Sequence, residues 1–598
     1  MILNLAAIAI VGGLTYLWMT RGFFSAFLNM VCVIAAGAIA FALWEPVSYF
    51  LLDKAPTRGL GVMLGDAAWG IGLAIPFAIA LALLRGVVDG VIRANAVTDS
   101  TTDYVGGGVC GLVSGIITAG VVALSIGSMR IGTESPLAAA PLSYSADVSG
   151  RGSLVRAGGL WVPVDRITAG IYGTLSETTL ASGEPLAKWY PDLDVAGPSA
   201  RMNFGKGKAR NTLKPTDFKI LGSYVVGDPA RGEKASELLS DAWSNTAQSY
   251  VYLDKEPFTQ GYLYGAVVEF LPGAKEKGGQ VTVGQGQVRL VAQDAEGEKT
   301  ITVHPAAVVS QGQSASIALG RWRFDSDDIQ IASVGGVSNV PMAFEFPLPV
   351  GYRPIGLYVK NVRYEIDPAA TPSMAFGSAS ERDNAIATRE ILMSDSTIPI
   401  DGGGLLVGAG GRDTGNQIPG VTVNNVFAKG KTLQRGTEQG LRAREKEPTI
   451  YDGEAKLAAA LLQRRGGLEK TLVINKFEVT PDTVIVQLEL SLDAAYGPML
   501  EASDKQQPPR LVDTNGTTYD AVGFIYFDDS LGHVRYTPGR PLTGLIEAPS
   551  LSRSKTNQSL ILVFRVSLGV SVQSFAIGSQ EIIRFETPIA CTQSQRNS

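Results

Sequence analysis

The sequence is poor in the side chains that most often bind metals and build disulfides. Its 598 residues include only two histidines and three cysteines. A structural zinc site needs three or four such ligands, and no Cys-x-x-Cys pair is present. A catalytic triad needs a histidine beside a nucleophile, but His304 precedes a proline and His533 follows a glycine, so we expect both at surface turns or strand ends. We therefore predict no metal, no cofactor and no enzymatic activity.

The chain also lacks an excess of positive charge. Lys and Arg number 51 against 56 Asp and Glu, which gives a net charge of -5. Proteins that bind nucleic acid carry basic surfaces, so no nucleic-acid partner is expected. The segment 430–432 ends like a phosphate-binding loop, but Asn425 occupies the place of the first glycine. Turn formation explains the aspartate runs at 325–328 and 528–529 better than calcium binding does.

Long apolar stretches, in contrast, are abundant near the beginning of the chain. Hydrophobic residues make up 45% of the sequence. Four stretches have about the length that a helix needs to cross a bilayer. They are Ile2–Met19, Phe23–Trp44, Ala67–Leu84 and Asp103–Gly127. We predict a four-helix transmembrane bundle over residues 1–130, with the lipid bilayer as its surroundings.

The fourth stretch carries a small residue at every fourth position. The members of this stripe are Gly107, Gly111, Gly115 and Ala119. Small side chains let the backbone of a neighbouring helix approach closely, so this face is predicted to be a helix contact. The partner is either another helix of the same bundle or the fourth helix of a second copy, which would make a homo-oligomer.

The positions of Lys and Arg predict the orientation in the membrane. No basic residue precedes the first stretch, and Arg21 follows it directly, which favours an N-terminus outside the cytoplasm. Arg85 supports this orientation, whereas Lys54 and Arg58 oppose it. Four spans return the chain to its starting side, so the large C-terminal region is predicted to be extracytoplasmic.

Two short motifs resemble one protein family. Arg21-Gly22-Phe23, at the start of the second stretch, resembles the turn between the first two helices of the CvpA family, the colicin V production proteins. Asp103 ends a polar turn before a glycine-rich last helix, as in that family. The resemblance covers about the first 130 residues. It implies a multi-pass protein of the bacterial inner membrane, linked to production of the toxin colicin V and to secretion or envelope functions, without enzymatic chemistry.

Residues 131–215 read as a linker with one amphipathic helix. Its apolar residues recur at spacings of three and four, as on one face of a helix. They are Trp161, Val164, Ile167, Ile171 and Leu175. Three placements fit this pattern: along the membrane surface, against the bundle, or within the soluble part. From residue 187 to 215 the chain reads as an irregular connection.

Strand signals dominate from residue 216 onward. Short strands separated by turns predict two antiparallel, immunoglobulin-like β-sandwiches, at residues 216–368 and 468–598. A mixed connector, 369–467, lies between them, and residues 451–464 are expected to form a helix there.

The two β regions read as copies of each other. Arg-Leu-Val occurs at 289–291 and at 510–512, followed each time by a turn that ends in Gly297 or Gly516. Phe346 and Phe564 each stand five residues before a glycine. The step from 297 to 516 is 219 residues, and the step from 346 to 564 is 218. The matching offsets favour an internal duplication.

Two functions fit the sequence. In the first, a non-enzymatic envelope protein uses the bundle to anchor tandem sandwiches, which bind an envelope protein or polymer. In the second, the bundle itself acts as a transport or secretion component. Ion pathways usually need ionisable groups at membrane depth, whereas the spans offer only polar groups such as Asn29 and Ser114, for which we predict interhelical hydrogen bonds. An anchored hydrolase that uses paired carboxylates is a third alternative. Cys591, near the chain end, offers a probe of sidedness if folding leaves it accessible.

Overall fold

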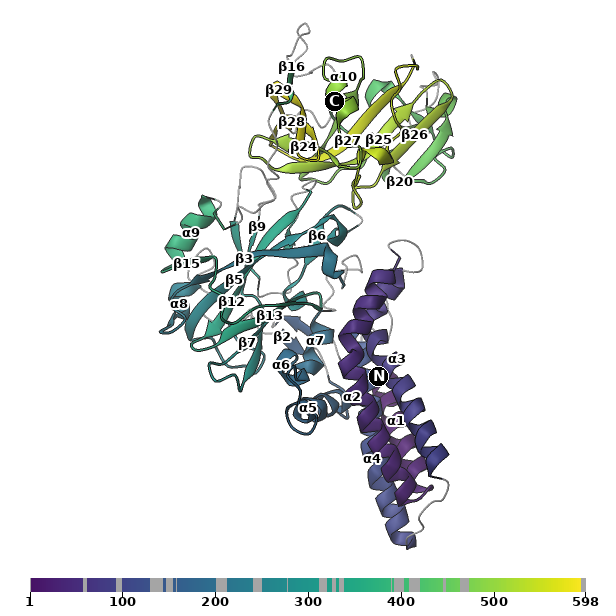
Figure 1. Ribbon diagram of the computed structural model, residues 1–598, viewed down its shortest axis with the longest axis vertical. Helices are drawn as coiled ribbons and strands as arrows, with labels where there is room; N and C mark the ends of the chain where they lie inside the picture. The colour runs from purple at the N-terminus through teal and green to yellow at the C-terminus, as the bar shows by residue number, and fades with distance from the viewer. Residues whose placement is uncertain are drawn as a thin grey trace.

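The computed structural model describes three consecutive parts of the chain, which Figure 1 shows as a helical bundle and two β regions. The N-terminus lies in the bundle, and the C-terminus lies in the β region farthest from it (Figure 1). The described residues are 2–592 apart from 57–61, 93–98, 130–143, 147–153, 157–158, 201–211, 240–249, 277, 311–319, 325–329, 333–337, 389, 392–402, 408–419, 445–447, 463–472 and 556. The aspartate run at 325–328 therefore lies outside the described residues.

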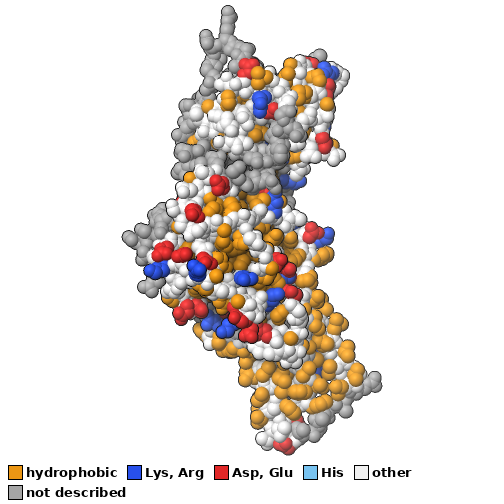
Figure 2. Space-filling model, turned by 60° about the vertical axis from the view of Figure 1, so that its left-hand side comes forward, with side chains coloured by type: hydrophobic (Ala, Val, Ile, Leu, Met, Phe, Trp, Pro, Cys, Tyr) orange, Lys and Arg blue, Asp and Glu red, His pale blue; other side chains and the backbone are white. Residues whose placement is uncertain are grey.

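The bundle consists of four helices that are long and apolar enough to cross a membrane, as predicted. They are α1 (Ile2–Met19), α2 (Phe23–Lys54), α3 (Val62–Val91) and α4 (Ser100–Ser128). Helix α4 packs against all three others, and α2 packs along α3. On the face seen in Figure 2, hydrophobic side chains cover the bundle, while charged side chains gather over the β regions. An apolar outer face of this kind suits hydrocarbon rather than water.

Helices α2 and α3 are much longer than α1. Helix α2 has 32 residues and α1 has 18, so at 1.5 Å per residue α2 is longer by about 20 Å. The extra turns of α2 follow Trp44 and carry Glu45, Asp53 and Lys54. Charged residues are costly in hydrocarbon, so this end of α2 extends out of the apolar layer, toward the first β region.

The described part of the connection between the bundle and the β regions contains the helices α5 (Val164–Glu177), α6 (Leu186–Trp189) and α7 (Leu193–Ala200). Helix α5 is the predicted amphipathic helix, and it packs against the bundle. The Tyr172 hydroxyl donates a hydrogen bond to the Ile34 carbonyl of α2 at 3.1 Å, and the Thr168 hydroxyl donates to the Ile116 carbonyl of α4 at 3.3 Å.

The expectation of an irregular connection after residue 187 was wrong, because α6 and α7 occupy part of it. Leu186, Trp189, Leu193 and Ala196 recur at spacings of three and four, and the last three of them are buried. This periodicity is the signal of a helical face.

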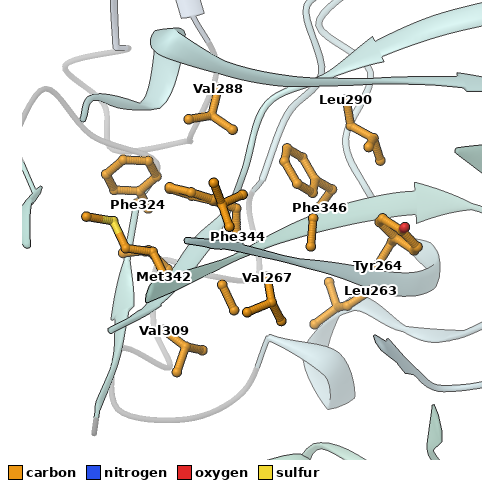
Figure 3. Close-up of a cluster of buried hydrophobic side chains, with 14 of the residues drawn as sticks. Leu263, Tyr264, Val267, Val288, Leu290, Val309, Phe324, Met342, Phe344 and Phe346 are labelled. Atoms are coloured by element: carbon orange, nitrogen blue, oxygen red, sulfur yellow. The ribbon is translucent and has the colours of Figure 1, made fainter. Parts of the chain in front are cut away.

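The first β region has two main sheets. Their orders are β10-β9-β12-β5-β3-β15 and β14-β13-β7-β8. The strands are β3 (Phe218–Val226), β5 (Gln260–Phe270), β7 (Val288–Gln293), β8 (Thr300–Val303), β9 (Ala307–Ser310), β10 (Gly320–Arg323), β12 (Val340–Pro349), β13 (Arg353–Val359), β14 (Val362–Glu365) and β15 (Met374–Phe376). Side chains of both sheets share one core, where Phe344 and Phe346 of β12 face Val288 and Leu290 of β7 (Figure 3).

The second β region is built on one large sheet. Its main path runs β16-β29-β28-β24-β25-β26-β20-β19, and β27 joins β25 to β23. The strands are β16 (Leu405–Val407), β19 (Leu441–Ala443), β20 (Thr449–Ala458), β23 (Thr483–Leu490), β24 (Pro509–Asp513), β25 (Thr518–Phe527), β26 (Leu531–Tyr536), β27 (Ser559–Ser567), β28 (Ser571–Ile577) and β29 (Gln580–Ala590). Thus β16, β19 and β20, from the predicted connector, pair into this sheet.

The two β regions repeat one pattern of strand pairing. In the first, β12 pairs with β5 and β9, and β13 pairs with β7 and β14. In the second, β27 pairs with β23 and β25, and β28 pairs with β24 and β29. Leu290 of β7 lies opposite Leu357 of β13, and Leu511 of β24 lies opposite Phe575 of β28. The paired residues of the two regions therefore correspond as well as the strands. The repeated topology supports the duplication that the sequence offsets favour.

Residues 451–464 do not form the predicted helix. Residues 451–458 belong to strand β20, and Ala459–Leu462 form a short 3-10 helix. Burial alternates along β20, where Ala455 and Leu457 are buried and Lys456 is exposed. Pairing with both β19 and β26 supplies backbone hydrogen bonds that outweigh the high helix propensity of alanine, leucine and lysine here.

Candidate functional site

The stripe of small residues on α4 faces α1 of the same chain. Its members are Gly107, Gly111, Gly115 and Ala119. A Cβ atom added at the second would lie 3.0 Å from Cα of Thr15, and one added at the third would lie 2.9 Å from Cα of Val11. The fourth packs in a small core with Leu3 and Ala7. Helix α1 therefore packs directly against the backbone of α4 along these small residues.

The residues that carry the family resemblance meet at one end of the bundle. They are Arg21, Gly22, Phe23 and Asp103. Gly22 has φ of 89°, a left-handed conformation that favours glycine, and it turns the chain from α1 into α2. The Phe23 N–H donates to Oδ1 of Asp103 at 3.2 Å, so one carboxylate lies near the positive N-terminal ends of both α2 and α4.

The cations at this end stack on one indole ring. The guanidinium carbons of Arg21 and Arg85 lie 5.4 and 5.1 Å from the ring centre of Trp18. Arg85 also pairs with Asp89 at 2.7 Å. The contact of Arg85 with Trp18 links α3 to α1 at this end of the bundle.

Polar groups inside the bundle pair with each other. Nδ2 of Asn29 on α2 donates to Oγ of Ser114 on α4 at 3.4 Å, and Oγ of Ser114 donates to the Cys110 carbonyl at 2.8 Å. Both side chains are buried. The predicted interhelical hydrogen bond is therefore present at this depth.

A cavity of about 320 Å³ lies where α2, α5 and β14 meet. We call it the junction cavity. Residues that define it are Ala38, Phe41, Glu45, Tyr172, Leu175 and Arg363. Its size is at the lower end of small-molecule sites, and its wall combines apolar residues with charged ones.

An ion pair lies in the wall of the junction cavity. A guanidinium nitrogen of Arg363 lies 3.0 Å from a carboxylate oxygen of Glu45, and the Tyr190 hydroxyl donates to that carboxylate at 2.6 Å. The backbone N–H of Arg363 donates a hydrogen bond to the hydroxyl oxygen of Tyr49 at 3.1 Å. Burial raises the pKa of Tyr190 well above its ordinary value, so its hydroxyl keeps the proton that it donates. These bonds fasten β14 to α2.

An aromatic cluster supports the ion pair. The ring of Trp44 lies 5.9 Å from that of Trp69 and 5.1 Å from that of Tyr190. Behind them, the guanidinium of the buried Arg289 lies 3.5 Å from the ring centre of Tyr358, an arrangement of cation and aromatic face. The cluster packs bundle, connector and first β region together.

The connector adds a second carboxylate to the junction cavity. Glu184 lines the cavity, accepts a hydrogen bond from the indole N–H of Trp189 and lies 3.6 Å from the ammonium nitrogen of Lys188. Ser176 and Ser182 add hydroxyl groups. The described residues bring together no three His, Cys, Asp or Glu side chains in a metal-binding group.

The two histidines are buried, which corrects the expectation of surface positions. Nδ1 of His304 lies 3.0 Å from the Val288 carbonyl oxygen, and burial lowers the pKa of this histidine to about 4. His533 lies within β26, where its Nε2 is 2.8 Å from Glu454 and its ring contacts Phe524. Both rings thus contribute to strand packing, and neither lines the junction cavity.

The aspartate pair at 528–529 forms a turn. Oδ1 of Asp528 accepts hydrogen bonds from the backbone N–H groups of Ser530 and Leu531, and Oδ2 lies 2.7 Å from Lys555. This is the turn role predicted from the sequence.

No protein-family model matches the chain, and no curated protein matches it. The resemblance to the CvpA family therefore rests on the residues that meet at one end of the bundle and on the order of the four spans.

Proposed function

We propose that this chain is a non-enzymatic, CvpA-like protein of the bacterial inner membrane. Its bundle anchors the two β regions outside the cytoplasm, and the β regions bind an envelope protein or polymer. The observation that carries this proposal is the junction, where the first β region is fastened to α2 rather than tethered by a free linker.

The fastening is extensive enough to set the orientation of the β regions. The ion pair of Glu45 and Arg363 is joined there by packing between Trp44, Tyr190 and Tyr358. Relative motion is the usual behaviour of domains within one chain, and the packing of aromatic side chains at this interface opposes it. An anchor that holds the β regions at a fixed angle to the bundle suits the presentation of a binding surface.

The two β regions are also joined to each other. The Ser338 N–H donates to the Thr518 carbonyl at 3.0 Å, and Oγ of Ser338 accepts from the Asp520 N–H at 2.9 Å. Lys275 is buried nearby, where loss of hydration lowers its pKa to about 8. The repeated strand pairing and the two-layered core of the first region support immunoglobulin-like sandwiches for both.

The second candidate is a transport or secretion component whose activity lies in the bundle. The cluster of Arg21, Phe23 and Asp103 favours it, because these residues carry the resemblance to a family linked to colicin V production. A homo-oligomer through α4 would have to use its outer face, where Tyr104 and Val109 are exposed, because α1 covers the glycine face.

A chain truncated after Arg130, which keeps only the bundle, separates the candidates. We expect the full chain to restore envelope integrity to a deletion strain, measured as leakage of a periplasmic enzyme, and the truncated bundle to restore none. Restoration by the bundle alone would assign the function to the membrane part.

A further inference from the structure

Helix α5 crosses the bundle at the level of its apolar segments. The Tyr172 hydroxyl donates to the Ile34 carbonyl of α2 at 3.1 Å, and the Thr168 hydroxyl reaches a carbonyl of α4 in the same way. The first charged residue after Ile34 in α2 is Glu45, eleven residues farther along, or about 16 Å along the helix axis. Helix α5 therefore lies beside the uncharged part of α2. In Figure 1 it lies beside the middle of the bundle, below both β regions.

The apolar surface of α2 continues past the level of α5. Leu43 is exposed on α2, nine residues beyond Ile34 and about 13 Å farther toward its charged end. A surface of this kind suits hydrocarbon, so the acyl layer around the bundle extends beyond the level at which Tyr172 contacts α2. Helix α5 packs against α2 and α4 from outside the four-helix bundle, and it therefore occupies space within that layer.

The segment that enters α5 lies at the boundary of the apolar layer. Helix α1 is about 27 Å long, close to the roughly 30 Å of a hydrocarbon layer, so its first turn marks one boundary. The Trp161 backbone N–H donates to Oδ1 of Asn4 in this turn at 2.8 Å, and the Trp161 side chain is 63% exposed. Indole rings favour the boundary between hydrocarbon and headgroups. The chain thus approaches α5 from the headgroup level.

The two flanks of α5 differ in character. The hydroxyl groups that contact α2 and α4 define the face of α5 that packs on the bundle. At 3.6 residues per turn, Arg166 lies to one side of this face, and Ile167 and Ile171 lie to the other. Nε of Arg166 is 3.4 Å from a carboxylate oxygen of Asp194 in α7, so the charged flank faces the connector. The apolar flank faces away from that contact.

The charged residues of α5 stand near its ends. They are Asp165 and Arg166 in the first turn and Glu177 at the last position. Residues 167–176 between them carry no charge. Asp165 is buried, and the long stem of an arginine lets its guanidinium reach the headgroup level. The middle of α5 therefore carries no charge that an acyl layer would exclude.

From this depth and this pattern we propose that α5 is embedded in the half of the bilayer nearer the β regions. Ile167 and Ile171 contact acyl chains, Trp161 lies at the boundary, and Arg166 stays on the headgroup side. The bilayer is thus a partner of the connector as well as of the four long helices, and it sets the height of the first β region above the membrane. The inference rests on the proposed crossing of the bilayer by the bundle, and it is independent of the side on which the β regions lie.

The test measures the depth of spin labels on the full chain in liposomes of phosphatidylethanolamine and phosphatidylglycerol. Labels are placed on Ile167→Cys and on Gly170→Cys, where an added Cβ atom meets nothing within 4 Å. Ile79→Cys, on the exposed face of α3, is the control for hydrocarbon, and Thr514→Cys, in the exposed hairpin between β24 and β25, is the control for water. Collision rates with oxygen, which dissolves in the acyl layer, and with a water-soluble nickel chelate report the depth of each label.

We expect the ratio of oxygen to nickel collisions at both α5 positions to exceed the ratio at Thr514→Cys at least about fivefold, as it should at Ile79→Cys. A ratio at either α5 position below that threshold, with a high ratio at Ile79→Cys, would place α5 in water. That result would overturn this inference and leave the spanning bundle intact. A low ratio at Ile79→Cys as well would overturn the spanning bundle and this inference with it.

Discussion

The glycine face of α4 gives a prediction whose size follows from the structure. A Cβ atom on Gly111 would lie 3.0 Å from both Cα of Thr15 and Cβ of Trp18 and 3.1 Å from the Leu14 carbonyl oxygen. Ordinary contacts are 3.4–4 Å, so α1 must move outward by a few tenths of an ångström for Gly111→Ala. Overpacking of this kind costs about 1–3 kcal/mol, and Gly111→Leu, with three further carbons, costs more.

The matched control is Gly108→Ala on the same helix. A Cβ atom there has Sδ of Met19 as its nearest neighbour, at an ordinary 3.6 Å. Both substitutions gain about 1 kcal/mol of helix propensity, so the difference between them isolates the contact with α1.

Unfolding of the purified variants by titration with a denaturing detergent measures this difference. We expect Gly108→Ala to match or exceed the wild-type stability, Gly111→Ala to fall about 1–3 kcal/mol below that control, and Gly111→Leu to fall further. Equal stability of the two alanine variants would refute the close approach of α1 and α4.

Three further predictions concern the junction, a buried histidine and a buried thiol. Arg363→Met removes the partner of Glu45, so the free energy needed to open the hairpin of β13 and β14 should fall by about 1–3 kcal/mol. Amide hydrogen exchange should become faster in this hairpin and stay unchanged in β27. Burial lowers the pKa of His304 from 6.5 to about 4. Between pH 6.5 and pH 4, this histidine therefore binds a proton in the unfolded chain but not in the folded chain. The free energy of unfolding should therefore fall by about 3 kcal/mol as the pH drops from 6.5 to 4, and a His304→Gln variant should lose that part of the slope in acid titrations. Cys591 is fully buried and its pKa is raised to about 12 by burial, so maleimide should label it only after denaturation, and labelling of the native chain would contradict its burial.

Patterns with a strong local signal predicted the structure well. The four spans appear because a bilayer demands about 20 apolar residues in a row, and few other folds leave that signature. The hairpins after residues 291 and 512 appear because glycine at 297 and 516 adopts the positive φ that each turn requires, 77° and 80°.

Features that depend on distant partners were not predictable. The segment 451–464 has the composition of a helix, and only its neighbours β19 and β26 make it a strand. His304 reads as a surface residue because nothing local reveals the carbonyls of Gln285 and Val288 that surround its ring. The same holds for the junction cavity, since Glu45 and Arg363 are separated by more than 300 residues.

Two engineered cysteines test the central claim, that the bundle crosses the bilayer and holds the β regions outside the cytoplasm. Thr514→Cys lies in the exposed hairpin between β24 and β25, and Ser100→Cys lies at the exposed start of α4, at the opposite end of the bundle from the β regions. The three native cysteines are buried, so we expect maleimide to label them little in the native protein. In cells with a permeable outer barrier and an intact inner membrane, a membrane-impermeant maleimide should label Thr514→Cys at once, and Ser100→Cys only after the inner membrane is broken. Labelling of both before lysis would contradict a spanning bundle, and the reverse order would place the β regions in the cytoplasm.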